Sequence, residues 1–296
     1  MMWFVFVIIT SLFNCAYYFG NQIAKVTPNV FMIYRGAIPV LLLLPFIPLL
    51  SYVTAWQFYF LCIIQGLIIS FIDYRNFKAI QTWGAEAVSS LHPFSVFVVF
   101  LLWLMLNPEI MINYTDNLWR FTGIIFSLSG IIYAVSSLKK SVIGRDLLIY
   151  LCPYFLGAAL CDVINKLCMS YVGNKSLLSA SCIYIVITGL VVTIVNTLIF
   201  IKNNNKINEI FKYVNLKYSL LVILLIGSMI SKNFAMFDVS NPSFVSATLY
   251  LYIIWIMLTG KILQKYGKFN KYCALDYKKV FILLICAVCL VLLDNK

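Results

Sequence analysis

The stretch NCAYYFGNQIAKVTPNVFMIYR, from Asn14 to Arg35, holds the end of one apolar segment, a short break at Val26–Asn29, and the start of the next. Before the break, polar residues recur at steps of four, three and four: Asn14, Tyr18, Asn21 and Lys25. That spacing puts their side chains on one face of an α-helix. The residues before Asn14 and those after the break are almost all apolar. Since hydrocarbon cannot satisfy amides or charges, this face is predicted to line a polar interior.

The composition is typical of a membrane protein. The chain has 296 residues, of which 63% are hydrophobic and only 11% charged, whereas a soluble domain carries about 25% charged residues. Its apolar runs are continuous over about twenty residues, the length of a bilayer-spanning helix, rather than alternating as in a barrel strand. The sequence therefore predicts an all-α polytopic membrane protein whose first partner is the lipid bilayer.

The apolar runs predict about ten transmembrane helices. Their expected bounds are Trp3–Ala24, Val30–Leu50, Trp56–Phe77, Trp83–Leu106, Leu118–Ser137, Asp146–Met169, Leu177–Ile201, Leu216–Phe237, Pro242–Leu263 and Tyr277–Leu293. The polar stretch Ser137–Arg145 is the expected seam between two five-helix halves, residues 1–140 and 141–296. Since five is an odd number, the second half is expected to enter the membrane inverted relative to the first, as in many secondary transporters.

The two halves share local features. The sixth predicted helix carries Asp162, Asn165 and Lys166 near its end, as the first carries Asn21 and Lys25. The third and eighth each reach an aromatic residue and an alanine before a short turn. The helices that follow open with small residues. These features favour an internal repeat.

Several polar residues are candidates for a substrate site between the halves. The predicted lining is Asn14, Tyr17, Tyr18 and Asn21 on the first helix, Glu86 and Ser90 on the fourth, Asp162 and Asn165 on the sixth, and Ser246 and Tyr250 on the ninth. Tyr154 and Trp255 are further aromatic candidates. The alternative interpretation of the first-helix residues is interhelical packing by hydrogen bonds.

Three charged or titratable groups have two interpretations each, and a fourth has one. Asp162 either forms an intrahelical pair with Lys166, four residues later, or faces the substrate. Glu86 either lines the site or pairs with Lys78 near the interface. His92, the only histidine, suits a structural hydrogen bond better than a proton relay. Arg35 is expected to extend along its own helix to the headgroups.

The order and spacing of several segments resemble the drug/metabolite transporter superfamily, in particular its ten-helix EamA-type members. The residues that carry this resemblance are Lys25, Arg35, the FKAI segment Phe77–Ile80, Pro93, Glu109, the Gly123/Gly130 pair and the DVINK segment Asp162–Lys166. The resemblance spans nearly the whole chain. It implies an energy-independent or proton-coupled carrier of small organic solutes that works by alternating access.

The sequence argues against other classes of protein. It has no GxxxxGK[ST] phosphate-binding loop, no filter-like loop, and no cluster of catalytic residues. The CxxC of Cys286 and Cys289 lacks His or acidic neighbours, so no metal or other cofactor is predicted. We expect a transporter, not an enzyme, for an amino acid, nucleoside or adenosine-type cofactor. A membrane-embedded enzyme or a scaffold is the alternative.

The remaining expectations concern partners and orientation. A proton is the candidate coupling ion, the protein is expected to be a monomer or homodimer, and the bacterial inner membrane is the expected location. The formal charge of +12 comes from Lys and Arg residues that lie mostly between the apolar runs, where they set topology rather than bind nucleic acid. They gather on the odd-numbered loops, which favours cytoplasmic odd loops and external termini. The family resemblance favours internal termini.

Overall fold

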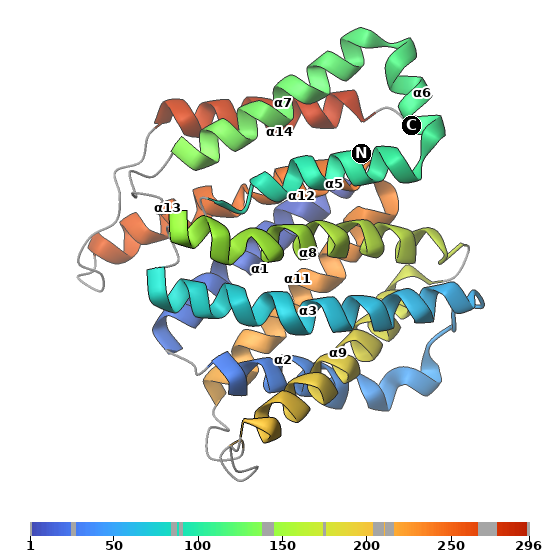
Figure 1. The fold of residues 1–296 in the computed structure, drawn as a ribbon, viewed down its shortest axis with the longest axis vertical. Helices are drawn as coiled ribbons and strands as arrows, with labels where there is room; N and C mark the ends of the chain where they lie inside the picture. The colour runs from blue at the N-terminus through green and yellow to red at the C-terminus, as the bar shows by residue number, and fades with distance from the viewer. Residues whose placement is uncertain are drawn as a thin grey trace.

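A computed structural model describes residues 2–24, 28–83, 88, 91–137, 145–173, 176–203, 210, 216–265 and 277–294. Within these ranges the regular structure is helical and contains no strand. The helices are α1 (Met2–Ala24), α2 (Pro28–Leu43), the 3₁₀-helix η1 (Leu44–Leu49), α3 (Trp56–Trp83), α5 (Phe94–Leu106), α6 (Pro108–Asp116), α7 (Leu118–Ser137), α8 (Arg145–Ser170), α9 (Leu177–Lys202), α11 (Leu216–Asp238), α12 (Pro242–Leu249), α13 (Tyr252–Lys265) and α14 (Tyr277–Leu293). They stack as a bundle with α7 and α14 at one edge and α2 and α9 at the other (Figure 1).

The bundle has the helix lengths and the surface of a membrane protein. Six of its described helices are long and apolar enough to cross a bilayer, and α5 with α6 forms a bent pair that would make a seventh. The residues Met2–Tyr17 and Pro242–Ile256 form shorter apolar helices. Large apolar side chains such as Leu41, Phe126 and Leu198 are exposed on the outside, where only lipid could cover them. The chain is an all-α, multi-pass membrane protein.

Two predicted boundaries are wrong because of local sequence. α3 continues six residues past Phe77 to Trp83, since no glycine or proline interrupts it before Gly84. Trp83 therefore ends a helix instead of starting one. The stretch Asn107–Asn117, predicted to be a polar connection, contains α6, which lies at 108° to α5. Pro108 suits the first position of a helix but disfavours a helical residue before it, which turns the chain at Asn107.

Two apolar segments are broken inside the bundle. Before α5, the amides of Ser95 and Val96 bond to the carbonyls of His92 and Pro93, three residues back. The predicted single span Pro242–Leu263 is likewise interrupted between α12 and α13, where the amides of Tyr250 and Leu251 bond three residues back. Pro93 lacks the amide that a continuous helix needs, whereas no proline marks the second break.

The helices pair in an antiparallel pattern. The start of α1 meets the end of α11, where the Trp3 amide donates to Asp238 Oδ2 at 3.1 Å. α3 pairs with α8, α2 with α9, and α7 with α14. In the α2–α9 pair the backbones touch at Gly36, because a β-carbon there would lie 2.5 Å from the Gly189 carbonyl oxygen.

One end of the bundle is tied together at the turn between α11 and α12. The side chain of Asp294 accepts hydrogen bonds from Ser240, Trp103 Nε1 donates to the Ser240 carbonyl at 3.1 Å, and Lys166 Nζ donates to the Val239 carbonyl at 2.6 Å. Since Trp3 also joins this turn, the first and last described residues lie at the same end. We call it the termini end and the other the opposite end.

Candidate functional site

Two adjoining cavities, of about 260 Å³ and 180 Å³, lie among α1, α2, α3, α8, α11 and α12. They share Arg35, Asp73, Tyr154, Asp162 and Lys232 among their lining residues, so we treat them as one central cavity. Placing four charged side chains inside a membrane protein has a large cost in desolvation free energy. Such charges are retained mainly along substrate or ion pathways.

The first charge pair joins α2 to α3. The Arg35 guanidinium forms an ion pair with the Asp73 carboxylate, and their side chains are 18% and 16% exposed. The expectation that Arg35 extends to the headgroups is wrong, because Asp73 offers it a partner inside the bundle. Arg75, two residues after Asp73, is exposed on the outer surface, as the helical spacing requires.

The second charge pair joins α8 to α11. Lys232 Nζ lies 2.5 Å from Asp162 Oδ1, and the Ser246 hydroxyl donates to Asp162 Oδ2 at 2.5 Å. Asp162 therefore faces the cavity and contacts side chains from two other helices, α11 and α12. Lys166, the alternative partner within the helix, donates to the carbonyls of Phe237 and Val239.

The two pairs lie at different depths. Helical rise puts Arg35 about 10 Å from the start of α2, and Asp73 about 9 Å before Ala79, where the apolar span of α3 ends; both points are at the opposite end. Asp162 and Lys232 lie about 12 Å and 9 Å from the last residues of α8 and α11, at the termini end. One ion pair thus lies toward each membrane surface.

Three buried amide side chains at the smaller cavity have atoms without a hydrogen-bond partner. Asn165 Nδ2 donates to Asn233 Oδ1 at 3.0 Å, which leaves Asn165 Oδ1 and Asn233 Nδ2 unsatisfied. Gln65 Oε1 is also unsatisfied, and all three side chains line the smaller cavity. A buried polar atom without a hydrogen bond costs about 1–3 kcal/mol, so these atoms are available to a polar ligand.

The broken segments add polar groups to the larger cavity. His92 Nε2 lies 3.2 Å from Asn76 Oδ1, and its ring packs on Tyr154 with centroids 4.9 Å apart. His92 thus has the hydrogen bond expected of a structural histidine, and it also lines the cavity together with Ser95. Tyr250, at the second break, lines the same cavity.

Six of the ten predicted site residues line the central cavity: Asn14, Tyr17, Asp162, Asn165, Ser246 and Tyr250. Asn14 accepts a hydrogen bond from the Ser228 hydroxyl at 2.7 Å, so it also joins α1 to α11. The side chains of Tyr18 and Asn21, and the residues Glu86 and Ser90, lie outside the described part of the chain. Trp255 instead donates to Ser11 at 2.9 Å.

Of the four charged residues that line the cavity, the sequence predicted only Asp162 as a site residue. The sequence pattern did not single out Asp73 or Lys232, nor the amides Gln65, Asn76 and Asn233. One signal could have found Asn76 and Asn233, because both precede a phenylalanine in the same Asn-Phe pair, on α3 and α11. Within the described ranges, no three His, Cys, Asp or Glu side chains are placed to hold a metal ion together.

The fold and this cavity define the class of the protein as a multi-pass helical membrane protein with a charged interior. No protein-family model matches the sequence, and no curated protein matches it either.

Proposed function

We propose that this protein is a secondary transporter that moves a small organic metabolite by alternating access. The observation that carries the proposal is the central cavity, where two interhelical ion pairs and unsatisfied amides surround a space of about 260 Å³ and 180 Å³. Charges inside a membrane bundle are typical of substrate pathways. A packing role alone does not require four charged side chains to line a cavity.

Ten transmembrane helices in two inverted repeats, as in the drug/metabolite transporter superfamily, are part of the proposal. The pairing of α1 with α11 has a counterpart in that of α8 with α3, as expected if the first span corresponds to the sixth and the third to the eighth. The second and seventh spans, α2 and α9, pair directly with each other, as do the fifth and tenth, α7 and α14.

The broken helices support the same arrangement. The fourth span is interrupted at His92–Pro93 and the ninth at Tyr250–Leu251, which are corresponding places in the two halves. Interrupted spans at corresponding positions mark the binding site in transporters with inverted repeats. Both interruptions here border the central cavity.

The depths of the ion pairs suggest how access alternates. In our proposal the Arg35–Asp73 pair closes the path toward the opposite end, and the Asp162–Lys232 pair closes the path toward the termini end. A solute that takes over the partners of one pair would weaken that closure. A ligand shifts such an equilibrium only through its differential affinity for the two states.

The lining favours solutes that carry both an acidic and a basic group. Arg35 and Lys232 can bind a carboxylate, while Asp73 and Asp162 can bind an ammonium group. Tyr154 adds an aromatic face for a cation or a base. Amino acids and adenosine-type cofactors with an amino-acid moiety combine these groups, so they come first in a substrate screen.

The test is a thermal-shift screen of a metabolite library on the purified protein, followed by flux of each hit into liposomes. We expect a hit to raise the unfolding temperature and to cross the membrane chemically unchanged. Chemical conversion of the hit would support the enzyme alternative. Binding without flux would support the scaffold alternative.

Gln65→Leu should separate transport from folding. The variant removes an unsatisfied amide oxygen from the cavity wall, so we expect an unchanged or higher unfolding temperature and a roughly tenfold lower uptake at limiting substrate. Gln57→Leu, on the same helix but away from the cavity, is the matched control and should transport normally. Normal uptake by Gln65→Leu would remove this amide from the site.

Labelling by a membrane-impermeant maleimide should establish the orientation. In a background without the native cysteines, Asn113→Cys on α6 and Asn203→Cys after α9 place thiols at exposed positions on opposite sides of the proposed topology. The charge bias predicts that intact cells are labelled at position 113 and protected at 203. The reverse pattern would favour internal termini.

A further inference from the structure

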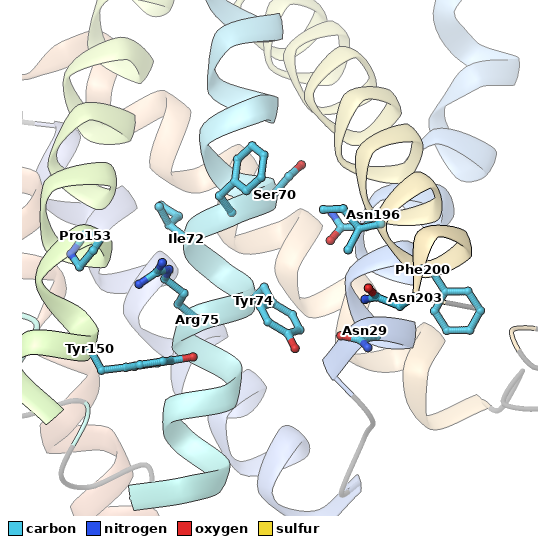
Figure 2. Close-up of a pocket in the computed structure, with 12 residues that line it drawn as sticks. Asn29, Ser70, Ile72, Tyr74, Arg75, Tyr150, Pro153, Asn196, Phe200 and Asn203 are labelled. Atoms are coloured by element: carbon cyan, nitrogen blue, oxygen red, sulfur yellow. The ribbon is translucent and has the colours of Figure 1, made fainter. Parts of the chain in front are cut away.

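A further cavity of the described structure has a lining separate from that of the central cavity except for Ile72, which lines both. It is a groove of about 500 Å³ across the outer face of α3 near the opposite end, bordered by α8 on one side and by α9 and the start of α2 on the other. Figure 2 shows Arg75 from α3 and Tyr150 from α8 both extending into the space between these two helices, and Tyr74 pointing toward the α9 side.

The groove has a polar rim at the depth of the lipid headgroups. α3 begins at Trp56, and Arg75 lies about 28 Å further along its axis, which is close to the hydrocarbon thickness of about 30 Å. Asn203, at the end of α9, and Asn29, at the start of α2, lie at the same rim (Figure 2). These side chains can hydrogen-bond to headgroup oxygens.

The deeper part of the groove carries large exposed apolar side chains beside Ser70 and Asn196, whose side chains donate to backbone carbonyls of their own helices. Phe71 lies one turn inside Arg75 on α3, and Ile199 one turn inside Asn203 on α9. Their exposed fractions are 59% and 37%, so hydrocarbon must cover them in a bilayer. The groove thus offers polar side chains at the depth of the headgroups and exposed apolar side chains deeper in the bilayer. A phospholipid places its headgroup and its acyl chains in the same order.

The charge at the rim is positive. The Arg75 guanidinium carbon lies 5.8 Å from the centroid of the Tyr150 ring. No carboxylate in the described ranges forms an ion pair with Arg75. Lys78, three residues after Arg75, and Lys202, next to Asn203 in sequence, are both exposed. Asp146, one turn before Tyr150 on α8, is exposed as well.

We propose that this groove binds one anionic phospholipid, with its phosphate at Arg75 and an acyl chain along Phe71 and Ile199. Arginine binds phosphate oxygens through two parallel hydrogen bonds, and basic pockets between membrane helices are a common form of anionic lipid site. The site is distinct from the central cavity and does not depend on the proposed transport.

The test uses the full-length protein in detergent and native mass spectrometry with added phosphatidylglycerol or phosphatidylcholine. We expect one molecule of phosphatidylglycerol to bind, and Arg75→Gln to weaken its binding by about tenfold. Lys78→Gln is the matched control, since it removes the same charge one turn away but outside the groove. It should change binding by less than about twofold.

Ile199→Trp tests the apolar part while keeping every charge. The larger side chain should fill the chain region and weaken phosphatidylglycerol binding even if Arg75→Gln disturbs folding. Equal binding of the two lipids would overturn the proposal, as would equal losses in Arg75→Gln and Lys78→Gln. Competition by sn-glycerol 3-phosphate at equal concentration would also overturn it, because that result would mark a solute site.

Discussion

Replacing Lys232 with methionine should abolish transport and lower the unfolding temperature. Asp162 would keep the Ser246 hydroxyl as a donor but would lose its countercharge inside the bundle. Removing one partner of a fully buried pair costs about 3–5 kcal/mol. Because 27% of the Lys232 side chain remains exposed, we expect about 2 kcal/mol here. Thermal unfolding in detergent and flux in liposomes measure the two effects.

The double variant Asp162→Asn with Lys232→Met separates the structural effect from the functional one. Neutralising both charges leaves no unpaired ion, so the unfolding temperature should recover most of its loss, while flux should stay absent. Each variant changes the free energy of unfolding by a measurable amount. The change in the double variant minus the sum of the changes in Asp162→Asn and Lys232→Met gives the coupling energy of the pair. Asp146→Asn, an exposed position on the same helix, is the control and should behave as wild type. Flux in the double variant would show that the pair is only structural.

Gly36→Ala should destabilise the α2–α9 contact. A methyl group there would lie 2.4 Å from Thr193 Oγ1, 2.5 Å from the Gly189 carbonyl and 2.7 Å from the Thr193 amide nitrogen. Two of these atoms belong to the backbone, so the helices must move apart. Overpacking of this kind costs about 1–3 kcal/mol. Thermal unfolding in detergent measures the loss.

Gly123→Ala is the matched control for Gly36→Ala. Its added methyl group would meet the tip of Leu293 at 3.1 Å, and a flexible side chain can move. We expect a change in unfolding temperature several times smaller than for Gly36→Ala. An equal fall in unfolding temperature in both variants would contradict this prediction. It would show that the backbone contact at Gly36 is not the cause of the destabilisation.

The helical class was predictable because lipid imposes a simple rule on the sequence. Every spanning segment must be apolar and about twenty residues long, so α7 and α14 begin and end at the predicted residues. Local chemistry also explains the deviations. α6 was missed because a short polar helix at a membrane surface has no apolar run, and the break at Tyr250–Leu251 was missed because no proline accompanies it.

The candidate site was most readily predictable where a polar side chain lies well inside an apolar helix. Asn14 and Asp162 fit that description, and each lines the cavity. Arg35, Asp73 and Lys232 lie nearer to helix ends, where a charge is equally compatible with the headgroups. Sequence position could not distinguish these two environments.

The sequence by itself determined the membrane class, most helix bounds and the face of α1 that carries Asn14, because these follow from hydrophobicity and helical periodicity. Only the tertiary structure decided which charges pair. Asp162 has Lys166 four residues away in sequence but pairs with Lys232 on another helix, since α8 packs beside α11 and the Lys166 side chain instead reaches carbonyl oxygens at the termini end. Partners between helices depend on how the helices pack, and that arrangement is a property of the whole bundle.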